Sequence, residues 1–330
     1  MAAKKNEPEV KKDPIAELRK KYGESLVYLS ASSAQKGIQV TPTGVLSLDI
    51  ALGVGGYPKG RIIEIVGQEA SGKTTLVLHA IAEVQKSGGT AAFIDAEHAL
   101  DPRYASNLGV DLDRLLFSQP DSGEHALEIC EDLVSTGAVS LVVVDSVAAL
   151  TPKSELDGEM GDAQMGAHAR LMSQAMRKLT GITSKTNTTI MFINQYRQKI
   201  GVMYGNPNVA TGGNALKFYA SQRLEVVKTK GAAGPDGKVV SSGMKVKVIK
   251  NKVAPPFSEA ELEIIWGQGI DKLGDLIALG TQHKFITVAG SWMECGNERH
   301  QGFNTFREAL KLRPDLQVQL RKEIITKVGL

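Results

Sequence analysis

The sequence predicts an α/β protein: a mostly parallel, twisted sheet flanked by helices, with a small helix and strand segment before it and a small α+β domain after it. Three observations predict this class. Short apolar runs alternate with helix-length segments from Gly44 onward, aromatic residues make up 5% of the chain, and 34 glycines supply turns. We expect strands that are apolar at nearly every position to be buried on both faces, as in parallel sheets covered by helices.

The apolar runs define the expected strands, and the segments between them have helical length and periodicity. The runs of the expected parallel sheet are Ile62–Val66, Ala91–Asp95, Leu115–Ser118, Leu141–Asp145 and Ile190–Asn194. Helices are expected at Thr74–Lys86, Gly123–Ser135 and Ala167–Ile182. After Tyr219, strands follow without long helices at Arg223–Val227, Met244–Ile249 and Leu262–Trp266, and a turn at residues 233–237 would join the first two. This pattern predicts an antiparallel extension of the sheet.

The beginning and the end of the chain differ from this core. Pro14 can open a helix on which Ile15, Leu18 and Tyr22 form a narrow apolar stripe. Such a stripe cannot bury itself, so we expect it to dock on the core or on a neighbouring subunit. The predicted divisions are residues 1–36 as an oligomerisation segment and linker, 37–269 as the core, and 270–330 as a small C-terminal domain.

Composition narrows the class of protein. Hydrophobic residues make up 42% and charged residues 23%, which is ordinary for a globular chain and argues against disorder. The N-terminus is charged, no apolar run reaches the about 18 residues of a membrane span, and Cys130 and Cys295 are too few for a disulfide framework. A cytoplasmic location without membrane contact is the simplest expectation. Neither a zinc ligand set nor the Gly-x-Ser-x-Gly motif of hydrolases is evident.

A phosphate-binding motif follows the first strand. Residues 67–74 fit G-x-x-x-x-G-K-[ST], and Thr75 continues into the expected helix. The expected nucleotide-binding residues are Gly67, Gln68, Glu69, Ala70, Ser71, Gly72, Lys73, Thr74 and Thr75. Backbone N–H groups would face the phosphates at the helix N-terminus, Lys73 would neutralise phosphate charge and the Thr74 hydroxyl would bind Mg²⁺. The motif predicts a P-loop that binds a nucleotide; the alternative is a glycine-rich turn with an exposed lysine.

Polar residues at other strand ends complete the expected site. Asp145 follows four apolar residues and would hold Mg²⁺ through water; the alternative is a helix cap. Glu97 follows the strand Ala91–Asp95 and would polarise the water that attacks the γ-phosphate. Gln195 would bond the γ-phosphate and report its loss to the following loop. Ordinary polar strand ends are the alternative for Glu97 and Gln195.

Basic residues suggest a nucleic acid partner. Arg170, Ser173 and Arg177 share one face of the expected helix Ala167–Ile182 and would contact phosphates; a solvated charged face is the alternative. From Arg197 to Lys252 the chain carries eleven lysines and arginines against two acidic residues. This stretch is compatible with a polyanion partner, and a solvated basic surface is the alternative; together with the resemblance described next, it suggests an electrostatic groove for DNA.

These motifs resemble the bacterial RecA recombinases over nearly the whole of Thr43 to Trp266. The resemblance is carried by the segments Ser47–Arg61 (SLDIALGVGGYPKGR), Asp95–Pro102 (DAEHALDP), Val144–Leu150 (VDSVAAL) and Ala215–Arg223 (ALKFYASQR), together with the P-loop. It implies a RecA-type core that hydrolyses ATP, forms a filament on single-stranded DNA, pairs it with homologous double-stranded DNA and exchanges strands. It also implies activation of LexA-type repressor self-cleavage.

The resemblance assigns further roles. It makes Glu97 the water-activating residue and Gln195 the γ-phosphate sensor, and it implies that Asp101 and Tyr104 hold the adenine. Two DNA-binding loops are implied, at residues 155–165 and 196–210, with the apolar wedges Met165 and Ile200 and with Gly212, Gly213 and Asn214 just beyond. Phe218 would pack into the adjacent subunit. Lys250 and Lys252 would reach the γ-phosphate bound by the neighbouring subunit.

Three departures from the family pattern change the expectations. Residues 21–29 (KYGESLVYL) replace the usual interface segment, and Asn208 replaces the usual acid of the second loop. The sequence ends in Lys-Val-Gly-Leu without an acidic tail, so no tail-based restraint on duplex binding is expected. Two rival functions stay open: a ring-shaped translocase or helicase on the same core, and a filament that serves mainly as a scaffold for a partner.

Overall fold

The computed structural model describes residues 13–26, 37–159, 166–198, 208–231 and 240–330. The chain divides into two compact units, residues 1–39 and 40–330. In the first unit, helix α1 (Pro14–Tyr22) begins at Asp13, whose carboxylate accepts the Ile15 N–H at 3.0 Å. Its apolar stripe is exposed within the described part of this unit: the solvent-exposed fractions of Ile15, Leu18 and Tyr22 are 54%, 46% and 51%. This exposure agrees with a stripe that needs a partner.

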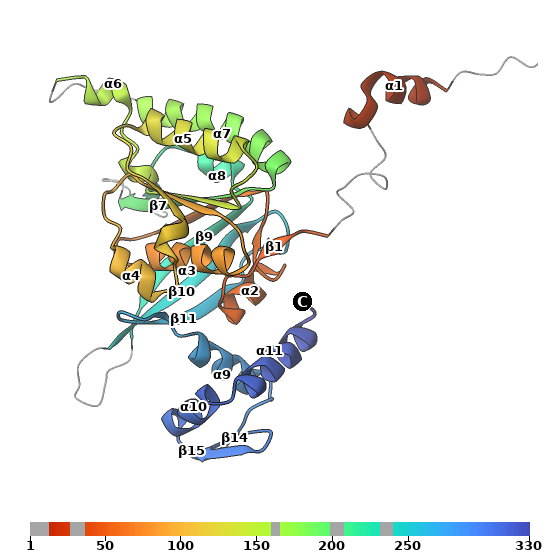
Figure 1. The fold of residues 1–330 in the computed structure, drawn as a ribbon, viewed down its shortest axis with the longest axis vertical. Helices are drawn as coiled ribbons and strands as arrows, with labels where there is room; N and C mark the ends of the chain where they lie inside the picture. The colour runs from red at the N-terminus through yellow and green to blue at the C-terminus, as the bar shows by residue number, and fades with distance from the viewer. Residues whose placement is uncertain (1–12, 27–36, 160–165, 199–207, 232–239) are drawn as a thin grey trace, which may run out of the picture. The chain divides into compact units, whose positions relative to one another are not determined.

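The second unit is built on a large mixed sheet (Figure 1). Within the described residues its order is β12-β11-β10-β9-β3-β7-β6-β4-β5, and β8 pairs with β7. Strands β9, β3, β7, β6, β4 and β5 run parallel, and β9 to β12 pair antiparallel. The bounds are β3 Ile62–Gly67, β4 Ala91–Asp95, β5 Leu115–Ser118, β6 Leu141–Asp145, β7 Thr189–Gln198, β8 Asn208–Ala210, β9 Gln222–Thr229, β10 Ser241–Asn251, β11 Glu259–Ile265 and β12 Gly269–Ile270. The predicted parallel core and antiparallel extension are confirmed.

Helices cover both faces of this sheet (Figure 1). Helix α3 (Lys73–Lys86) packs on one face, where its Leu76, Leu78 and Ile81 join the core of β3 and β10. Helices α5 (Gly123–Ser135), α7 (Ala167–Thr186) and α8 (Ala215–Tyr219) form the second core on the other face. The shorter elements are β1 Val40–Thr41 paired with β2 Tyr57–Pro58, α2 Leu46–Leu52, α4 Pro102–Asn107 and α6 Lys153–Leu156. None of the helices in the described residues is long and apolar enough to cross a membrane.

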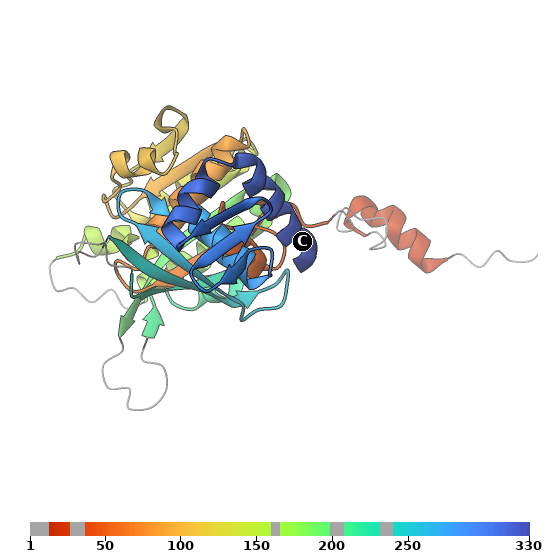
Figure 2. The same cartoon turned by 90° about the horizontal axis from the view of Figure 1, so that it is seen from below.

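Two sequence expectations about strands are wrong. The run Leu115–Ser118 is not buried on both faces, because β5 is the edge strand and leaves Leu116 and Phe117 45% and 50% exposed. The strand through Gln195 does not end there: parallel pairing with β3 stops at Gln195, but β7 continues to Gln198 because β8 pairs with it. Figure 2 shows the ends of β7 and β8 leaving the sheet as a two-stranded arm.

The C-terminal residues form their own small core. The elements are α9 Lys272–Gln282, β13 Thr287–Ala289, β14 Trp292–Cys295, β15 Glu298–Gln301, α10 Phe303–Lys311 and α11 Pro314–Val328, with the three strands in one antiparallel sheet. Phe306 and Leu310 are buried in this core. It also takes in Leu46 of α2, and Arg321 of α11 binds the Asp49 carboxylate at 3.1 Å.

Candidate nucleotide and DNA site

The predicted phosphate loop joins β3 to α3 in a conformation that requires glycine. Gly72 has φ +95°, and a Cβ there would lie 2.6 Å from Ile264 Cδ1. A Cβ on Gly67 would lie 2.3 Å from the Val226 carbonyl oxygen of the neighbouring strand. The Ser71 hydroxyl is buried and has no hydrogen-bond partner among the described residues. Glycines allow close approach to the backbone of the loop, and the buried Ser71 hydroxyl is free to donate. Both features suit an anionic ligand.

Lys73 points back into this loop, and its Nζ donates to the Gln68 carbonyl at 2.7 Å. Burial lowers the pKa of Lys73, while the carboxylates of Asp145, Glu97 and Glu69 act in the opposite direction. The ammonium group therefore lies in a cluster of acids, held by one backbone oxygen that a phosphate could replace.

Thr74 and Asp145 meet across the ends of α3 and β6. The Thr74 hydroxyl donates to Asp145 Oδ2 at 2.9 Å. Burial raises the pKa of Asp145 to about 7; the hydrogen bond from Thr74 opposes this shift, and the carboxylates of Glu97 and Asp95 add to it. One hydroxyl and one carboxylate are oxygen ligands of the kind that Mg²⁺ takes beside phosphate oxygens and waters. The donor set fits the predicted ion.

Glu97 is held by two hydrogen bonds to the same carboxylate oxygen. Gln195 Nε2 donates to Glu97 Oε1 at 2.6 Å, and the Ser146 hydroxyl donates to that oxygen as well. The residues that follow β4 and β6 and the part of β7 where its pairing with β3 stops therefore bring an acid, a hydroxyl and an amide together. Such a carboxylate can take a proton from water, and its contact with Gln195 joins it to the strand that leads into residues 199–207.

A cavity of about 400 Å³ opens beside the phosphate loop. The hydroxyls of Tyr104 and Thr75 lie 2.9 Å apart on its wall, and Asp101 caps α4 by accepting the N–H groups of Arg103 and Tyr104. The remaining lining comes from residues 70–74 and from Lys228, Ser242, Ile264 and Trp266. Its size and mixed polar and aromatic walls suit a nucleoside.

The predicted DNA-contacting residues gather around α7. Arg170 and Arg177 are exposed on this helix, and the Ser173 hydroxyl donates to the Ala169 carbonyl at 2.8 Å. Gly212 and Gly213 have φ +78° and +75° and lie against α7: a Cβ on Gly213 would come within 2.9 Å of Ala169 Cβ. Asn214 follows at the exposed start of α8. Met165 and Ile200 lie outside the described residues, as do the turn at 233–237 and the Asn208 side chain.

The predicted interface residues lie on the α8 side of the sheet. Lys250 Nζ donates to the carbonyls of Lys217 and Phe218 at 2.7 and 2.9 Å, and Lys252 Nζ donates to the Phe218 carbonyl at 3.2 Å. The Phe218 side chain is 67% exposed. Burial lowers the pKa of Lys250 to about 8, with Lys252 and Arg223 adding to this effect.

A β-bulge aims the two lysines. Val248 pairs with Leu224 and Lys250 pairs with Arg223, so Ile249 is an extra residue on β10. Val248 is buried in the core on the α3 side. Regular alternation would direct Lys250 into that core as well, and the extra residue turns it to the other face.

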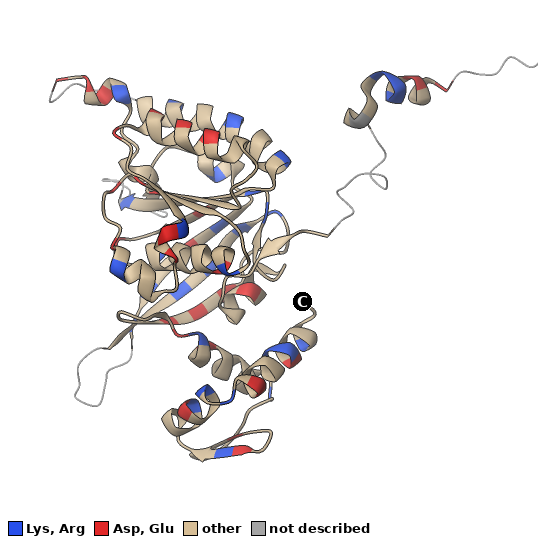
Figure 3. Cartoon of the chain, in the orientation of Figure 1, with Lys and Arg blue, Asp and Glu red and all other residues tan. Residues whose placement is uncertain are grey.

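In the described part of the stretch from Arg197 to Lys252, some of the basic side chains bind acidic residues. Lys245 binds Glu259 and Glu261 at 3.1 and 2.8 Å, because β11 places acids opposite the lysines of β10 (Figure 3). Arg223 is buried in an ion pair with Glu64. Charge that is clustered in sequence is therefore partly neutralised across strands.

Comparison with known proteins decides the family. The family model for the RecA N-terminal domain matches residues 10–271. Protein RecA of Caulobacter vibrioides is 56% identical over 311 residues, which cover 94% of this chain and 87% of that protein. Protein RecA of Syntrophus aciditrophicus is 56% identical over 318 residues, or 96% and 92% of the two chains. The chain belongs to the RecA family.

As a RecA-family protein, it is a DNA-dependent ATPase that acts in homologous recombination and DNA repair. A crystal structure of the RadB recombinase superposes with a TM-score of 0.53 at 23% identity, over 70% of this chain and 98% of that one. At this identity the likeness shows the fold alone. The RecA-type fold agrees with the predicted fold class.

Two residues that contact the candidate ATP site were not predicted from the sequence. Ser146 donates a hydrogen bond to Glu97, and its position directly after Asp145 in the segment Val144–Leu150 could have indicated this role. Trp266 was expected inside a strand, but β11 ends at Ile265 and the indole lines the nucleoside cavity. A sequence signal for Trp266 was its amphipathic indole at the end of an apolar run, since tryptophan is enriched where one side of the ring is packed and the other meets solvent or a ligand.

Proposed function

We propose that this chain assembles on single-stranded DNA as an ATP- and Mg²⁺-dependent filament and pairs that strand with homologous double-stranded DNA. The observation that carries the proposal is the contact between Glu97 and Gln195 at 2.6 Å. It joins the candidate hydrolytic carboxylate to β7, which leads directly into the second candidate DNA loop. DNA contact and ATP turnover can influence each other through this strand.

At the ATP site, each residue has a role that its surroundings support. Lys73 and the N–H groups of residues 67–75 bind the phosphates, and Asp101 and Tyr104 hold the base. Glu97 takes the proton from the attacking water, and Gln195 senses the γ-phosphate. Thr74 and Asp145 would hold Mg²⁺, which supplies charge compensation on the phosphate oxygens when bound.

For DNA, we propose that Arg170, Ser173 and Arg177 contact phosphates and that Gly212, Gly213 and Asn214 approach the backbone closely. Met165 and Ile200 would insert between bases. Exposed arginines on α7 beside the tightly packed glycine pair support this arrangement.

Between subunits, we propose that Lys250 and Lys252 stabilise phosphate charge at the neighbour's ATP site, as an arginine finger does, and that Phe218 packs on that neighbour. Residues 1–36 would serve in oligomerisation, 37–269 as the ATPase core and 270–330 as a separate C-terminal domain. We also propose activation of LexA-type repressor self-cleavage by the assembled filament.

The decisive test of strand pairing is D-loop formation by the purified protein with ATP, a single-stranded oligonucleotide and homologous supercoiled duplex. A heterologous duplex is the control. Filaments in electron micrographs together with D-loops support the proposal. Closed rings that unwind duplex would instead favour a translocase, and filaments without D-loops would favour a scaffold.

The role of the lysines is tested by mixing two inactive variants, Glu97→Gln and Lys250→Ala/Lys252→Ala. If the lysines act on the neighbour's site, co-assembly creates interfaces with all three groups intact, and DNA-stimulated ATPase activity returns. Light scattering checks that both variants assemble together. Co-assembly without activity would contradict action across the interface.

A further inference from the structure

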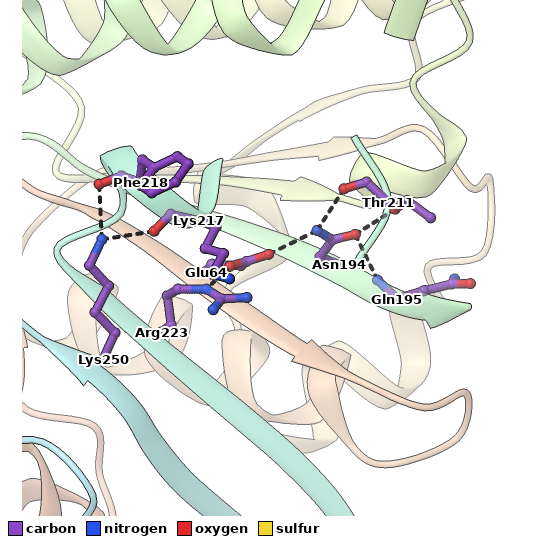
Figure 4. A network of polar contacts seen from close by, with 8 residues as sticks. All are labelled: Glu64, Asn194, Gln195, Thr211, Lys217, Phe218, Arg223 and Lys250. Atoms are coloured by element: carbon purple, nitrogen blue, oxygen red, sulfur yellow. Dashed lines mark hydrogen bonds and ion pairs between the residues drawn. The ribbon is translucent and has the colours of Figure 1, made fainter. Parts of the chain in front are cut away.

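A buried polar cluster contacts both the candidate phosphate sensor Gln195 and Thr211, which follows the second candidate DNA loop (Figure 4). It consists of Glu64 on β3, Asn194 on β7 and Arg223 on β9, three adjacent strands of the sheet. Glu64 and Asn194 are 1% and 0% exposed. None of the predicted roles uses these side chains, although charged and amide groups are costly to bury without a purpose in packing or in function.

Asn194 uses all of its hydrogen-bonding capacity. Its Oδ1 accepts the Gln195 N–H at 2.8 Å and the Thr211 hydroxyl at 2.5 Å. Its Nδ2 donates to Glu64 Oε1 at 2.8 Å and to the Thr211 carbonyl at 3.2 Å. One amide therefore holds the backbone of the candidate phosphate sensor and, at two points, Thr211, the residue that directly follows the second candidate DNA loop.

Glu64 fixes the orientation of this amide. Because Glu64 as a carboxylate only accepts, the nitrogen of Asn194 must face it and the oxygen must face Gln195 and Thr211. Arg223 compensates the buried charge through the ion pair between its Nε and Glu64 Oε2. Arg223 also pairs in register with Lys250 at the β-bulge, so the same cluster borders the strand that carries the interface lysines.

We propose that Asn194, oriented by the buried Glu64–Arg223 pair, is a positioning residue that couples the DNA loop to the ATP site. A displacement of Thr211 by bound DNA acts on the Asn194 amide and through it on Gln195, which contacts Glu97. The inference rests on the proposed function, since it assumes that residues 196–210 contact DNA.

The test uses a charge exchange in the full-length chain. Asn194→Asp replaces the amide donor with a carboxylate that faces Glu64, so the two side chains repel each other. We expect DNA stimulation of ATP turnover to fall at least about ten-fold, while the KM for ATP changes little, because an unpaired buried charge disrupts the cluster. Adding Glu64→Gln restores a donor toward the carboxylate introduced at position 194 and keeps one negative charge beside Arg223. The double variant should recover part of the stimulation, since the contact between the side chains at positions 64 and 194 is restored while the hydrogen bond to the Thr211 carbonyl stays lost.

The pH dependence of Asn194→Asp gives an independent readout. Two adjacent carboxylates hold a shared proton more strongly, and the introduced carboxyl group would, once protonated, again donate to Glu64. Stimulation in the single variant should therefore rise between pH 8 and pH 6, relative to wild type, and the double variant should lack this rise. The charged and titratable groups around the cluster are Arg223 and Glu225 on β9, Tyr196 on β7, Lys250 on β10, Lys217 on α8 and His168 on α7. They are common to all variants, so the comparison cancels them.

A milder pair of variants keeps the test valid if Asn194→Asp does not fold. Thr211→Val removes only the hydroxyl donated to Asn194 and should lower DNA stimulation several-fold. Thr188→Val is the matched control, because it removes a threonine hydroxyl that is buried more deeply than that of Thr211 and donates to the Val139 carbonyl at 2.7 Å outside the cluster. It should leave stimulation unchanged.

The outcomes separate this inference from the proposed function. Wild-type protein without DNA-stimulated turnover would refute the proposed function itself. With normal wild-type stimulation, full stimulation in Asn194→Asp, or a folded double variant as defective as the single one, would overturn the coupling role. If only Thr211→Val and Thr188→Val fold, equal effects of the two would overturn it too.

Discussion

Ser146→Ala tests how firmly the candidate hydrolytic carboxylate must be held. The Ser146 hydroxyl and the Gln195 amide both donate to Oε1 of Glu97, so the substitution removes one of two hydrogen bonds to a charged group. Hydrogen bonds to charged groups contribute about 1.5–3 kcal/mol. Because Gln195 still holds the oxygen, we use the lower end, and about 1.5 kcal/mol corresponds to about a ten-fold loss of kcat.

The assay is steady-state ATP hydrolysis with saturating single-stranded DNA, and we expect KM to change less than kcat. Ser87→Ala is the control, since its hydroxyl donates at 2.8 Å to the Val84 carbonyl at the end of α3, away from the site. A Ser146→Ala variant with wild-type kcat would refute the reasoning.

Three other predictions concern stability, the nucleoside cavity and DNA. Burial lowers the pKa of His79 to about 4, so between about pH 6.5 and pH 4 the unfolded chain binds a proton that the folded chain excludes. The free energy of unfolding should therefore fall by about 3 kcal/mol as the pH is lowered through this range, and His79→Gln should remove this pH dependence in urea denaturation. Trp292→Phe leaves Trp266 as the one tryptophan of the sequence, and ATP should change its fluorescence. Trp266→Ala should raise the KM for ATP about ten-fold because stacking on the base is lost. An unchanged fluorescence signal and an unchanged KM would show that the indole does not contact the nucleotide. Arg170→Ala and Arg177→Ala should each reduce the salt dependence of single-strand binding by about 0.7; identical slopes in wild type and both variants would contradict phosphate contacts.

The sequence predicts well what depends on neighbouring residues. The phosphate loop is recognisable because its glycines, Lys73 and Thr74 form one local motif between a strand and a helix. Asp145 and Glu97 could be placed near it because the carboxyl ends of parallel strands meet at one edge. The pairing of β9 with β10 followed from apolar runs on both sides of a turn.

What the sequence could not predict depends on which strands become neighbours. Leu116 and Phe117 look like core residues until β5 is known to be the edge strand. Lys245 looks like part of a basic patch until β11 places Glu261 opposite it. Glu64 and Asn194 are 130 residues apart, and only the β3–β7 pairing makes them partners.

The extra residue on β10 makes spacing as important as residue identity in this part of the chain. Each residue of a regular strand belongs to one of two faces, and Ile249 shifts everything after it by one place. Deleting Ile249 would keep every charged side chain and the total charge, yet it would exchange the faces to which residues 250–252 belong. A sequence alignment would still show both lysines in such a variant. Their ammonium groups, however, would no longer lie on the side of the sheet where Phe218 is exposed.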